Sequence, residues 1–557
     1  MLDAVSASVA PENHPPSRLF YDTHMLIFKH NIKLITTIIF TALLFLLAAF
    51  FATHALETPT RAATQPRPRS AANHVPHTTK GQSAWIIEQN LLRGSNAWKI
   101  DGPAAGDKLE GFLNTTYSAN RQNITFYIST IANEYRIRAF RMGYYQGKGA
   151  RLIWVSQLLK GHVQPACGIK QQVNMVSCDN WKQSYRLWLS KAFVQGDYLF
   201  ELVAKNNLKS YIPLTIWDPT SRATYIIKND VLTWQAWNSY GGYDFYAGIG
   251  NCSGGYPLCS RARVVSFDRP YNYGNGAGDF LINEYPLVYF AEEHGLNVTY
   301  ITDITLIQHP QLLRYHKALL SLGHDECWSY TERVAVENAA KLHGLNVAFF
   351  GASAMLRHVR IQNSPIGNDR EEVDYRDSSA DPMDNNGRPG YPMLVTGNTW
   401  SSPPADWSED NFVGEEYVGF VQSDEPAQPV IIKNADSFLF RGVTYDGKAI
   451  FAGEKIPGII ASDFDSADPY LDIPSLKIAT ESPIGQNVAF FQSGNASNGF
   501  AYSEMSYHFE KPSGALIFDS GTNNWIQSLT PCPHTAKFCP AEFSQKVTLN
   551  LLLRMSQ

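Results

Sequence analysis

The sequence predicts an α/β fold, a doubly wound parallel sheet, that follows an all-β domain and an N-terminal apolar segment. Three observations lead to this prediction. Residues 34–52 carry no charge, residues 84–219 alternate apolar and polar side chains, and from residue 220 short apolar runs alternate with helical patterns. At 557 residues the chain is long enough for two to four domains.

The apolar segment has the features of a membrane or export signal. Residues 34–52 follow Lys29 and Lys33 and are long enough to cross the inner membrane, with residues 1–33, whose start could be over-long, in the cytoplasm. A cleaved signal peptide is the alternative. Residues 53–83 are rich in Pro, Thr, Ala and Arg, which predicts a disordered linker. In both cases the remaining chain is expected to be periplasmic or extracytoplasmic.

The cysteines agree with export. Six of the seven form close pairs in loops: Cys167 with Cys178, Cys252 with Cys259, and Cys532 with Cys539. Such local pairs predict disulfides in an oxidising compartment, although zinc binding by the last two pairs is an alternative. Cys327 is left over, either as a small buried residue or as a nucleophile.

Residues 84–219 predict an antiparallel β-sandwich of immunoglobulin-like type. Runs such as 123–129, 135–142 and 198–203 have the alternation of strands, and glycine-rich turns separate them. This domain shows no catalytic pattern.

Residues 220–557 predict the α/β domain. Strands are expected at 297–303, 318–322 and 345–351, with helices at 279–293 and from about 329 to 343 between them. Strands joined by helices favour a doubly wound parallel sheet.

The stretch from Lys317 to Trp328 is the strongest candidate for a site. The uncharged strand ends at Gly323, and His324 and Glu326 follow before a helix that a capping pattern opens at Ser329. The carboxyl end of a strand in an open α/β sheet is where ligands bind. An ordinary polar loop is the alternative.

The net charge is −5 and no block of Lys or Arg occurs outside the flanks of the apolar segment. We therefore expect no nucleic-acid partner.

Several motifs occur in the order seen in one family. They are WQAWNSYGGYDFY, SFDRPY, YITDITL, GHDECW and VAFFGASAMLRHVRI, followed by GIIASDFD at 458–465 and GTNNW at 521–525. In this order they resemble the large (beta) subunit of N,N-dimethylformamidase and its relatives, over about residues 223–529. The resemblance implies an amidotransferase-like α/β fold, hydrolysis of a small amide-type substrate, and either a homo-oligomer or a second subunit.

The resemblance also implies a mononuclear Fe(III) held by two tyrosinates and one glutamate. Glu326 matches the family's glutamate and His324 its histidine, and Tyr246 and Tyr271 are the best candidates for the tyrosines, with Tyr240 behind them. Iron would polarise the amide carbonyl and acidify a bound water, and His324 would move the proton.

The chain departs from the family at several positions. Trp237 stands at a tyrosine, Cys327 at another, Ser353 at an asparagine, and Asp463 at a frequent glutamate. The resulting candidates fall into two sets. For catalysis they are His324, Glu326, Cys327 and Asp463, and for substrate binding Trp237, Asn238, Arg269, Ser353, Arg360 and Asn524. For Arg269 a loop-capping role is the alternative, and for Arg360 a structural ion pair.

Three function classes follow from these residues. The first is an exported hydrolase of amide-type C–N bonds that uses Glu326 and His324, with or without iron. The second is a cysteine-dependent hydrolase or transferase that uses Cys327. The third is a non-catalytic envelope protein that keeps the fold for binding.

Overall fold

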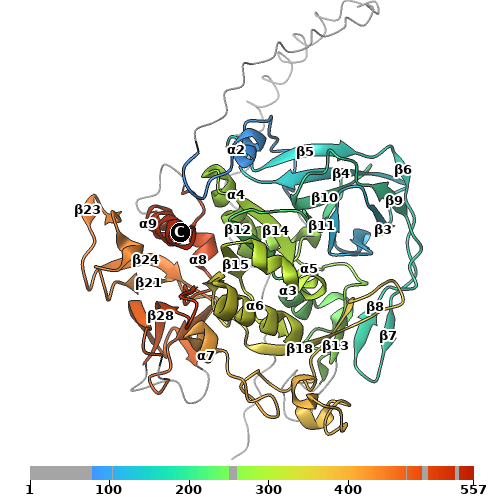
Figure 1. The fold of residues 1–557 in the computed structure, drawn as a ribbon. Coiled ribbons are helices and arrows are strands. Elements are labelled where there is room, and N and C mark those ends of the chain that lie inside the picture. Colours follow the sequence, from blue (N-terminus) through green and yellow to red (C-terminus); the bar gives the residue numbers. More distant parts are fainter. Residues whose placement is uncertain (1–77, 103, 250–259, 472, 492–499, 533–538) are drawn as a thin grey trace, which may run out of the picture. The chain divides into compact units, whose positions relative to one another are not determined.

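The computed structural model describes residues 78–557, apart from 103, 250–259, 472, 492–499 and 533–538 (Figure 1). Residues 75–557 form one compact unit. The predicted membrane segment at 34–52, and most of the predicted linker, lie outside the described residues. In the described part of the chain, no helix has the length and apolar character needed to cross a membrane.

After one short helix, the first part of the described chain is mainly β-strand. One sheet has the order β1-β3-β9 and a second the order β2-β11-β10-β4-β5. Apolar side chains of both sheets share one core, which includes Phe126 and Phe200. The strands are β1 (Leu109–Leu113), β2 (Tyr117–Ala119), β3 (Asn123–Thr130), β4 (Glu134–Met142), β5 (Ala150–Val155), β9 (Tyr185–Trp188), β10 (Gly196–Ala204) and β11 (Lys209–Trp217).

A seven-stranded sheet follows, with the order β14-β12-β15-β17-β29-β28-β26. The strands from β14 to β29 pair in parallel, whereas β28 and β26 are antiparallel to their neighbours. The bounds are β12 (Tyr225–Asn229), β14 (Val298–Thr302), β15 (Ala318–Gly323), β17 (Asn346–Gly351), β26 (Lys477–Gly485), β28 (Phe500–Phe509) and β29 (Leu516–Asp519).

Short helices join the parallel strands or cover the sheet. They are α3 (Val231–Ala236), α4 (Tyr285–Glu293), α5 (Asp303–Gln308), α6 (Tyr330–His343), α7 (Asp410–Val413), α8 (Trp525–Ser528) and α9 (Pro540–Met555), with α2 (Ala84–Asn90) before the first sheet. The predicted start and end of α6 are confirmed. Ser329 Oγ accepts from the Glu332 backbone N–H at 3.3 Å, and Gly344 ends the helix with φ +71°.

The prediction of a doubly wound parallel sheet is wrong as the fold class of this chain. Strands hold 33% of the described residues and helices 21%, and the large sheet is mixed. The reason lies in residues 352–515, which separate β17 from β29 along the chain. A doubly wound fold needs a helix there, but this segment forms mainly short strands. These short strands belong to four small sheets, one of which also includes β13 (Val264–Ser266) and β16 (Cys327–Ser329) from earlier in the chain. The strands from the segment are β18 (Arg357–Gln362) and β19 (Glu371–Val373) in that sheet, β20 (Glu416–Val421), β25 (Asp463–Ser466) and β27 (Ala489–Phe491) in the second, β21 (Gln428–Ile431) and β24 (Lys455–Ile460) in the third, and β22 (Thr444–Tyr445) and β23 (Lys448–Ala449) in the fourth.

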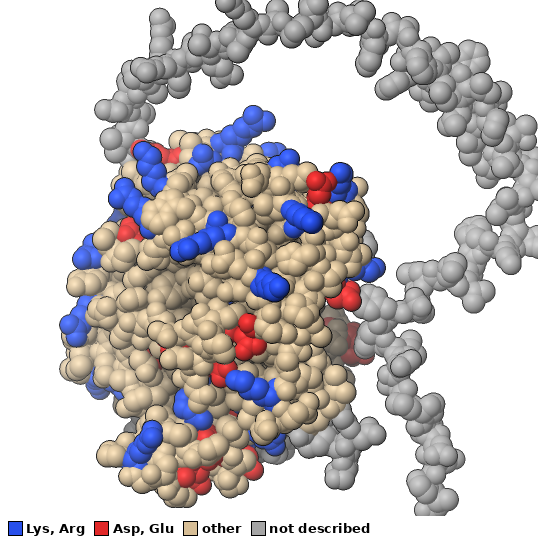
Figure 2. Space-filling model, turned by 90° about the vertical axis from the view of Figure 1, so that its right-hand side faces the viewer, with Lys and Arg blue, Asp and Glu red and all other residues tan. Residues whose placement is uncertain are grey.

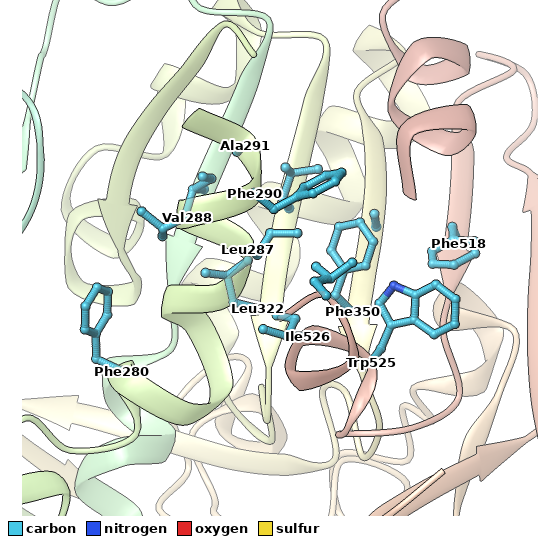
Figure 3. Packing of buried hydrophobic residues seen from close by; sticks show 14 of the residues in the cluster. Phe280, Leu287, Val288, Phe290, Ala291, Leu322, Phe350, Phe518, Trp525 and Ile526 are labelled. Atoms are coloured by element: carbon cyan, nitrogen blue, oxygen red, sulfur yellow. The ribbon is translucent and has the colours of Figure 1, made fainter. Parts of the chain in front are cut away.

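The core of the large sheet explains why its parallel strands are almost wholly apolar. Figure 3 shows α4 facing the sheet with Leu287 and Phe290, beside Leu322 of β15 and Phe350 of β17. Trp525 of α8 closes the same cluster, and each of these side chains is 1% exposed or less. Burying one such side chain stabilises the fold by about 1.5–3 kcal/mol.

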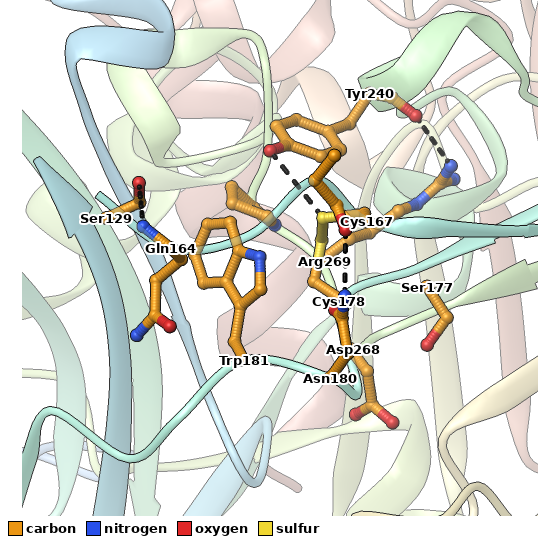
Figure 4. The surroundings of a disulfide bond; sticks show 12 residues. Ser129, Gln164, Cys167, Ser177, Cys178, Asn180, Trp181, Tyr240, Asp268 and Arg269 are labelled. Carbon is orange, nitrogen blue, oxygen red and sulfur yellow. Dashed lines mark hydrogen bonds between the residues drawn. A yellow bond between two sulfur atoms is a disulfide. The ribbon is translucent and has the colours of Figure 1, made fainter.

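Two of the three predicted disulfides are confirmed. Cys167 and Cys178 join the ends of the hairpin formed by β7 (Gly168–Lys170) and β8 (Met175–Ser177), and Cys532 pairs with Cys539. Zinc binding by Cys532 and Cys539 is therefore wrong. Cys252 and Cys259 lie outside the described residues. Figure 4 shows that the Cys178 backbone N–H donates to the Asp268 carbonyl, at 2.6 Å, so the hairpin is fixed to the chain that carries Arg269.

Candidate functional site

The predicted site residues meet at the carboxyl ends of two neighbouring strands. Trp237 follows α3, which begins just after β12, and His324 and Glu326 follow β15 at Gly323. Gly323 has φ +47°, and a Cβ atom there would lie 2.4 Å from the Asn283 carbonyl oxygen. Only glycine fits this turn, which directs the following polar residues to the site.

The Glu326 carboxylate is the centre of the site. Its Oε2 accepts hydrogen bonds from the Tyr246 hydroxyl and from Trp237 Nε1–H, the latter at 3.2 Å. Its Oε1 accepts from Arg357 Nε–H at 3.0 Å. Burial alone would raise the pKa of Glu326, but the charges of Arg357 and His324 lower it below its usual value. Glu326 is therefore an ionised carboxylate at neutral pH.

Tyr246 and Trp237 form one wall of the site. Their rings stack with centroids 3.7 Å apart and planes 13° apart, and the Arg376 guanidinium carbon lies 4.2 Å from the centre of the Tyr246 ring. Burial and the nearby Glu326 charge raise the pKa of Tyr246 well above its ordinary value. Tyr246 is therefore a neutral phenol that donates to the carboxylate.

His324 lies between two carboxylates. Its Nε2 is 3.4 Å from Asp463 Oδ2 and 3.5 Å from Glu326 Oε2, and it has no hydrogen-bond partner among the described residues. Burial lowers the pKa of His324, but Asp463 and Glu326 outweigh this effect and raise it to about 9. The imidazole is therefore protonated at neutral pH, and the two carboxylates on either side stabilise its positive charge.

Asp463 is more open to solvent than Glu326. Its side chain is 19% exposed against 4% for Glu326, and Oδ2 accepts from Ser353 Oγ at 3.1 Å. Trp237 is 40% exposed, so water and a small ligand can reach the site beside its indole.

Cys327 lies next to Glu326 in the chain but points into the core. It is fully buried, and burial together with the Glu372 carboxyl raises the pKa of its thiol. A nucleophilic cysteine needs exposure and a lowered pKa. Neither is present, which argues against the cysteine-dependent class.

Most of the other predicted binding residues hold the loops together. Asn238 Nδ2 donates to the Pro270 carbonyl at 2.9 Å, and the buried Arg269 donates to the Tyr240 and Tyr243 carbonyls. Arg360 forms a bidentate ion pair with Asp381, at 2.9 and 3.2 Å. This is the structural ion pair given above as the alternative to a substrate-binding role.

Two more predicted residues lie apart from the carboxylate. Asn524 Nδ2 donates to the Ile459 carbonyl at 3.0 Å. Tyr271 packs edge-on against Trp234 and Tyr273, and no contact between it and Glu326 is found within the described ranges.

Sequence reasoning missed two residues at the site. Arg357 holds Glu326, and Tyr417 of β20 lies near Asp463 and Glu326, whose charges add to burial in raising the pKa of Tyr417. The only signal for Arg357 is its place in the VAFFGASAMLRHVRI motif. No sequence signal identifies Tyr417, because it reaches the site only through the pairing of β20 with β25, in which it lies opposite Asp465.

A buried ionic cluster lies beneath the site. Lys228 Nζ is 2.5 Å from Asp303, 2.8 Å from Asp325 and 3.0 Å from Asp230, and all of these side chains are almost completely buried. The three aspartates are spaced closely enough to hold a metal ion. The lysine ammonium already contacts all three, so it serves as the cation of this cluster.

The sequence profile of the N,N-dimethylformamidase beta subunit-like, C-terminal family matches residues 136–537. The chain belongs to this family. The match begins well before the expected limit near residue 223 and includes strands of the first part from β4 onward. The family resemblance stated from the motifs is thereby confirmed.

No curated protein matches this dimethylformamidase-like chain. A solved structure with some similarity is a cycloisomaltooligosaccharide glucanotransferase of Paenibacillus sp. complexed with cycloisomaltoheptaose, at 8% identity and a TM-score of 0.16. The match covers 44% of this chain and 39% of that one. The chain thus spans about two fifths of that enzyme's length, and the likeness carries no argument about fold or function.

The residues of this dimethylformamidase-like site do not fit the family's iron. Trp237 offers an N–H donor where a tyrosine oxygen is needed, and it shares Glu326 Oε2 with the Tyr246 hydroxyl. Arg357 occupies Oε1, and the Arg357 and Arg376 charges oppose a further cation. The carboxylate thus has three donors in place of a metal.

Proposed function

We propose that this protein hydrolyses an amide-type C–N bond by acid–base catalysis at His324 and Asp463. Family membership supports the reaction class, since the family takes its name from an amide hydrolase. The observation that carries the proposal is the His324 imidazole, protonated between two carboxylates, whose Nε2 makes no hydrogen bond in the described part of the chain. A largely buried, charged imidazole with an N–H free of hydrogen bonds is typical of a general acid.

Asp463 has the properties of the general base. It is the more exposed carboxylate, and Ser353 is the hydrogen-bond donor to its side chain. In the proposed reaction its carboxylate takes a proton from water, and the hydroxide attacks the amide carbon. The His324 imidazolium gives its proton to the leaving nitrogen, so the C–N bond breaks with release of a neutral amine.

Glu326 acts as a positioning residue. Three donors fix its carboxylate, and its lowered pKa keeps it charged. A fixed negative charge 3.5 Å from His324 Nε2 favours the protonated imidazole. The Trp237 indole provides a half-exposed apolar face for a small substrate.

Assays of the full-length protein with formamide, N,N-dimethylformamide, acetamide and N-methylacetamide test the proposal by the amine or ammonia released. We expect turnover that His324→Asn and Asp463→Asn each reduce by roughly 10²–10⁴-fold. His343→Asn, at the exposed end of α6, is the matched control and should keep wild-type activity. Wild-type inactivity on all four amides, or full activity of His324→Asn, would overturn the proposal.

We also propose that the described part works in an oxidising compartment outside the cytoplasm. The disulfides Cys167–Cys178 and Cys532–Cys539 support this proposal. Detection of the protein in the cytoplasmic fraction, with its cysteines reduced, would contradict it.

A further inference from the structure

A groove surrounds Trp217, the last residue of β11. It consists of three adjoining hollows, each lined in part by this indole. One hollow lies beside the edge strand β2 and has a volume of about 380 Å³. None of the three is lined by His324, Glu326 or Asp463, so the groove is separate from the proposed active site.

Aromatic rings form a fixed platform in this groove. The Trp217 and His309 rings stack with centroids 4.7 Å apart, and Tyr117 stands at 81° to the indole. The Tyr117 hydroxyl donates to Gln308 Oε1, and Gln308 Nε2 donates to Asp369 Oδ2 at 2.6 Å. The platform is therefore held in place before any ligand binds.

Hydrogen-bonding groups around the platform are left for a ligand. Gln122 accepts from Ser118 and Ala119 through Oε1, which leaves its Nε2 donors without a partner in the described ranges. The exposed Asn123 side chain lines the same hollow. Thr116 Oγ1 is buried there and also lacks a partner among the described residues. These amide and hydroxyl groups can donate and accept hydrogen bonds.

The groove carries a few charges of both signs, and neighbouring groups engage them. Asp218 accepts from the Thr220 hydroxyl, Arg222 donates to the Thr220 and Ser221 carbonyls, and Asp369 accepts from Gln308. Burial lowers the pKa of His309, so this ring is neutral at pH 7, and the Arg370 guanidinium is buried against Asp268 and the Leu113 and Phe267 carbonyls. Lys and Arg are scattered over the face shown in Figure 2 and do not gather into one patch. A nucleic acid needs a positively charged groove, so stacking of its bases is disfavoured here.

We propose that the Trp217 groove binds a neutral oligosaccharide. Sugar rings present apolar C–H faces that pack on aromatic rings, and their hydroxyl groups donate to and accept from side-chain amides. The three hollows meet at Trp217, which favours a chain of sugar units over a single one. The other two hollows add aromatic and amide side chains, including Trp85, Asn120, Gln195 and Tyr315.

Isothermal titration of the full-length protein with maltohexaose, cellohexaose and xylohexaose tests this proposal. The protein should be kept in a detergent without a sugar head group, because such a group would compete. We expect binding of at least one hexaose, weakened at least about 10-fold by Trp217→Ala, which corresponds to about 1.4 kcal/mol. Gln122→Ala, at an exposed position, should weaken binding without risk to the fold.

Trp188→Ala is the matched control, because Trp188 is 54% exposed on β9 and does not line the groove. Its affinity should equal that of the wild type. Failure of all three hexaoses to bind, equal affinity of Trp217→Ala and wild type, or preference for a peptide or a sulfated hexasaccharide would each overturn the proposal. Amide turnover measured on the same samples does not depend on oligosaccharide binding. Failure of one proposal therefore leaves the other testable.

Discussion

The Trp237 indole and the Tyr246 hydroxyl donate to the same oxygen of Glu326, and Arg357 donates to the other. A carboxylate with both oxygens engaged by fixed donors has little capacity left for a metal ion. The indole has no lone pair to offer in compensation. This one side chain therefore separates the proposed acid–base site from the iron site that the family resemblance implies.

Replacing Trp237 with tyrosine tests that argument. Trp237→Tyr places a second phenol oxygen next to Tyr246 and Glu326, which is the donor set that Fe(III) prefers. We expect the variant to gain iron during metal-replete growth and to show a tyrosinate-to-iron colour. Metal analysis and visible absorption measure both effects, and Trp188→Tyr should stay colourless as a control. Stoichiometric iron in the wild type, lost in Glu326→Ala, would show that the donors around Glu326 yield to the metal.

The sequence pattern could identify His324 and Glu326 as candidate site residues, because they lie in a short loop between the end of a strand and the start of a helix. Asp463 needed the resemblance, since 136 residues separate it from Cys327 and only the pairing of β25 with β20 fixes its place. Tyr271 was predicted as a ligand beside Glu326, but its ring packs on Trp234, and no contact with Glu326 is found among the described residues. Local sequence patterns predict where a strand or helix ends, but they do not predict which distant strands pair.

The Lys228 cluster joins several elements at their ends. Lys228 lies near the end of β12, and Asp230 directly follows that strand. Asp303 starts α5 after β14, and Asp325 follows β15. One ammonium thus holds three neighbouring strand ends together. Glu332 of α6 lies 3.5 Å from the same ammonium, and both of its oxygens lack hydrogen-bond partners within the described residues.

Removal of this ammonium should destabilise the fold strongly. Lys228→Met leaves several buried carboxyl groups without a cation, and we expect it to lower the free energy of unfolding by about 3–5 kcal/mol. Glu332→Gln is the contrasting variant. Burial raises the pKa of Glu332 well above its usual value, so the group is already neutral and its amide should cost little. Urea denaturation compares the two, and equal stability of Lys228→Met and wild type would contradict this role.

The same elements show what the sequence could and could not predict. The apolar strand at 318–322 and the capped helix after it were found correctly, because buried runs and caps are local signals. The fold class was wrong, because residues 352–515 form strands whose partners are distant, such as β20 with β25 and β27. The sequence there alternates too briefly for strands to be identified.

At the scale of the whole molecule, burial affects many acids in the same direction. Burial raises the pKa of Asp197 and Asp519 to about 7 and that of Glu409 to about 8. In the unfolded chain these groups have ordinary, lower values. Between the two values the folded state binds more protons, so the free energy of unfolding is greatest at low pH and falls as pH rises. His324, with a pKa of about 9, acts in the same direction.

We therefore expect the melting temperature to fall from about pH 4 to pH 9, because the folded state binds the extra protons between the unfolded and folded pKa values of these groups: about pH 4 to 8 for the carboxyls and about pH 6.5 to 9 for His324. Asp197→Asn isolates one contribution. Asp197 is 2% exposed, and its carboxyl accounts for about 4 kcal/mol of pH dependence between its ordinary pKa and its folded pKa of about 7. The variant should show a shallower decline, measured by calorimetry at several pH values. Asp107→Asn, at an exposed position, should follow the wild type, and a wild-type slope in Asp197→Asn would show that this carboxyl is already ionised in the fold.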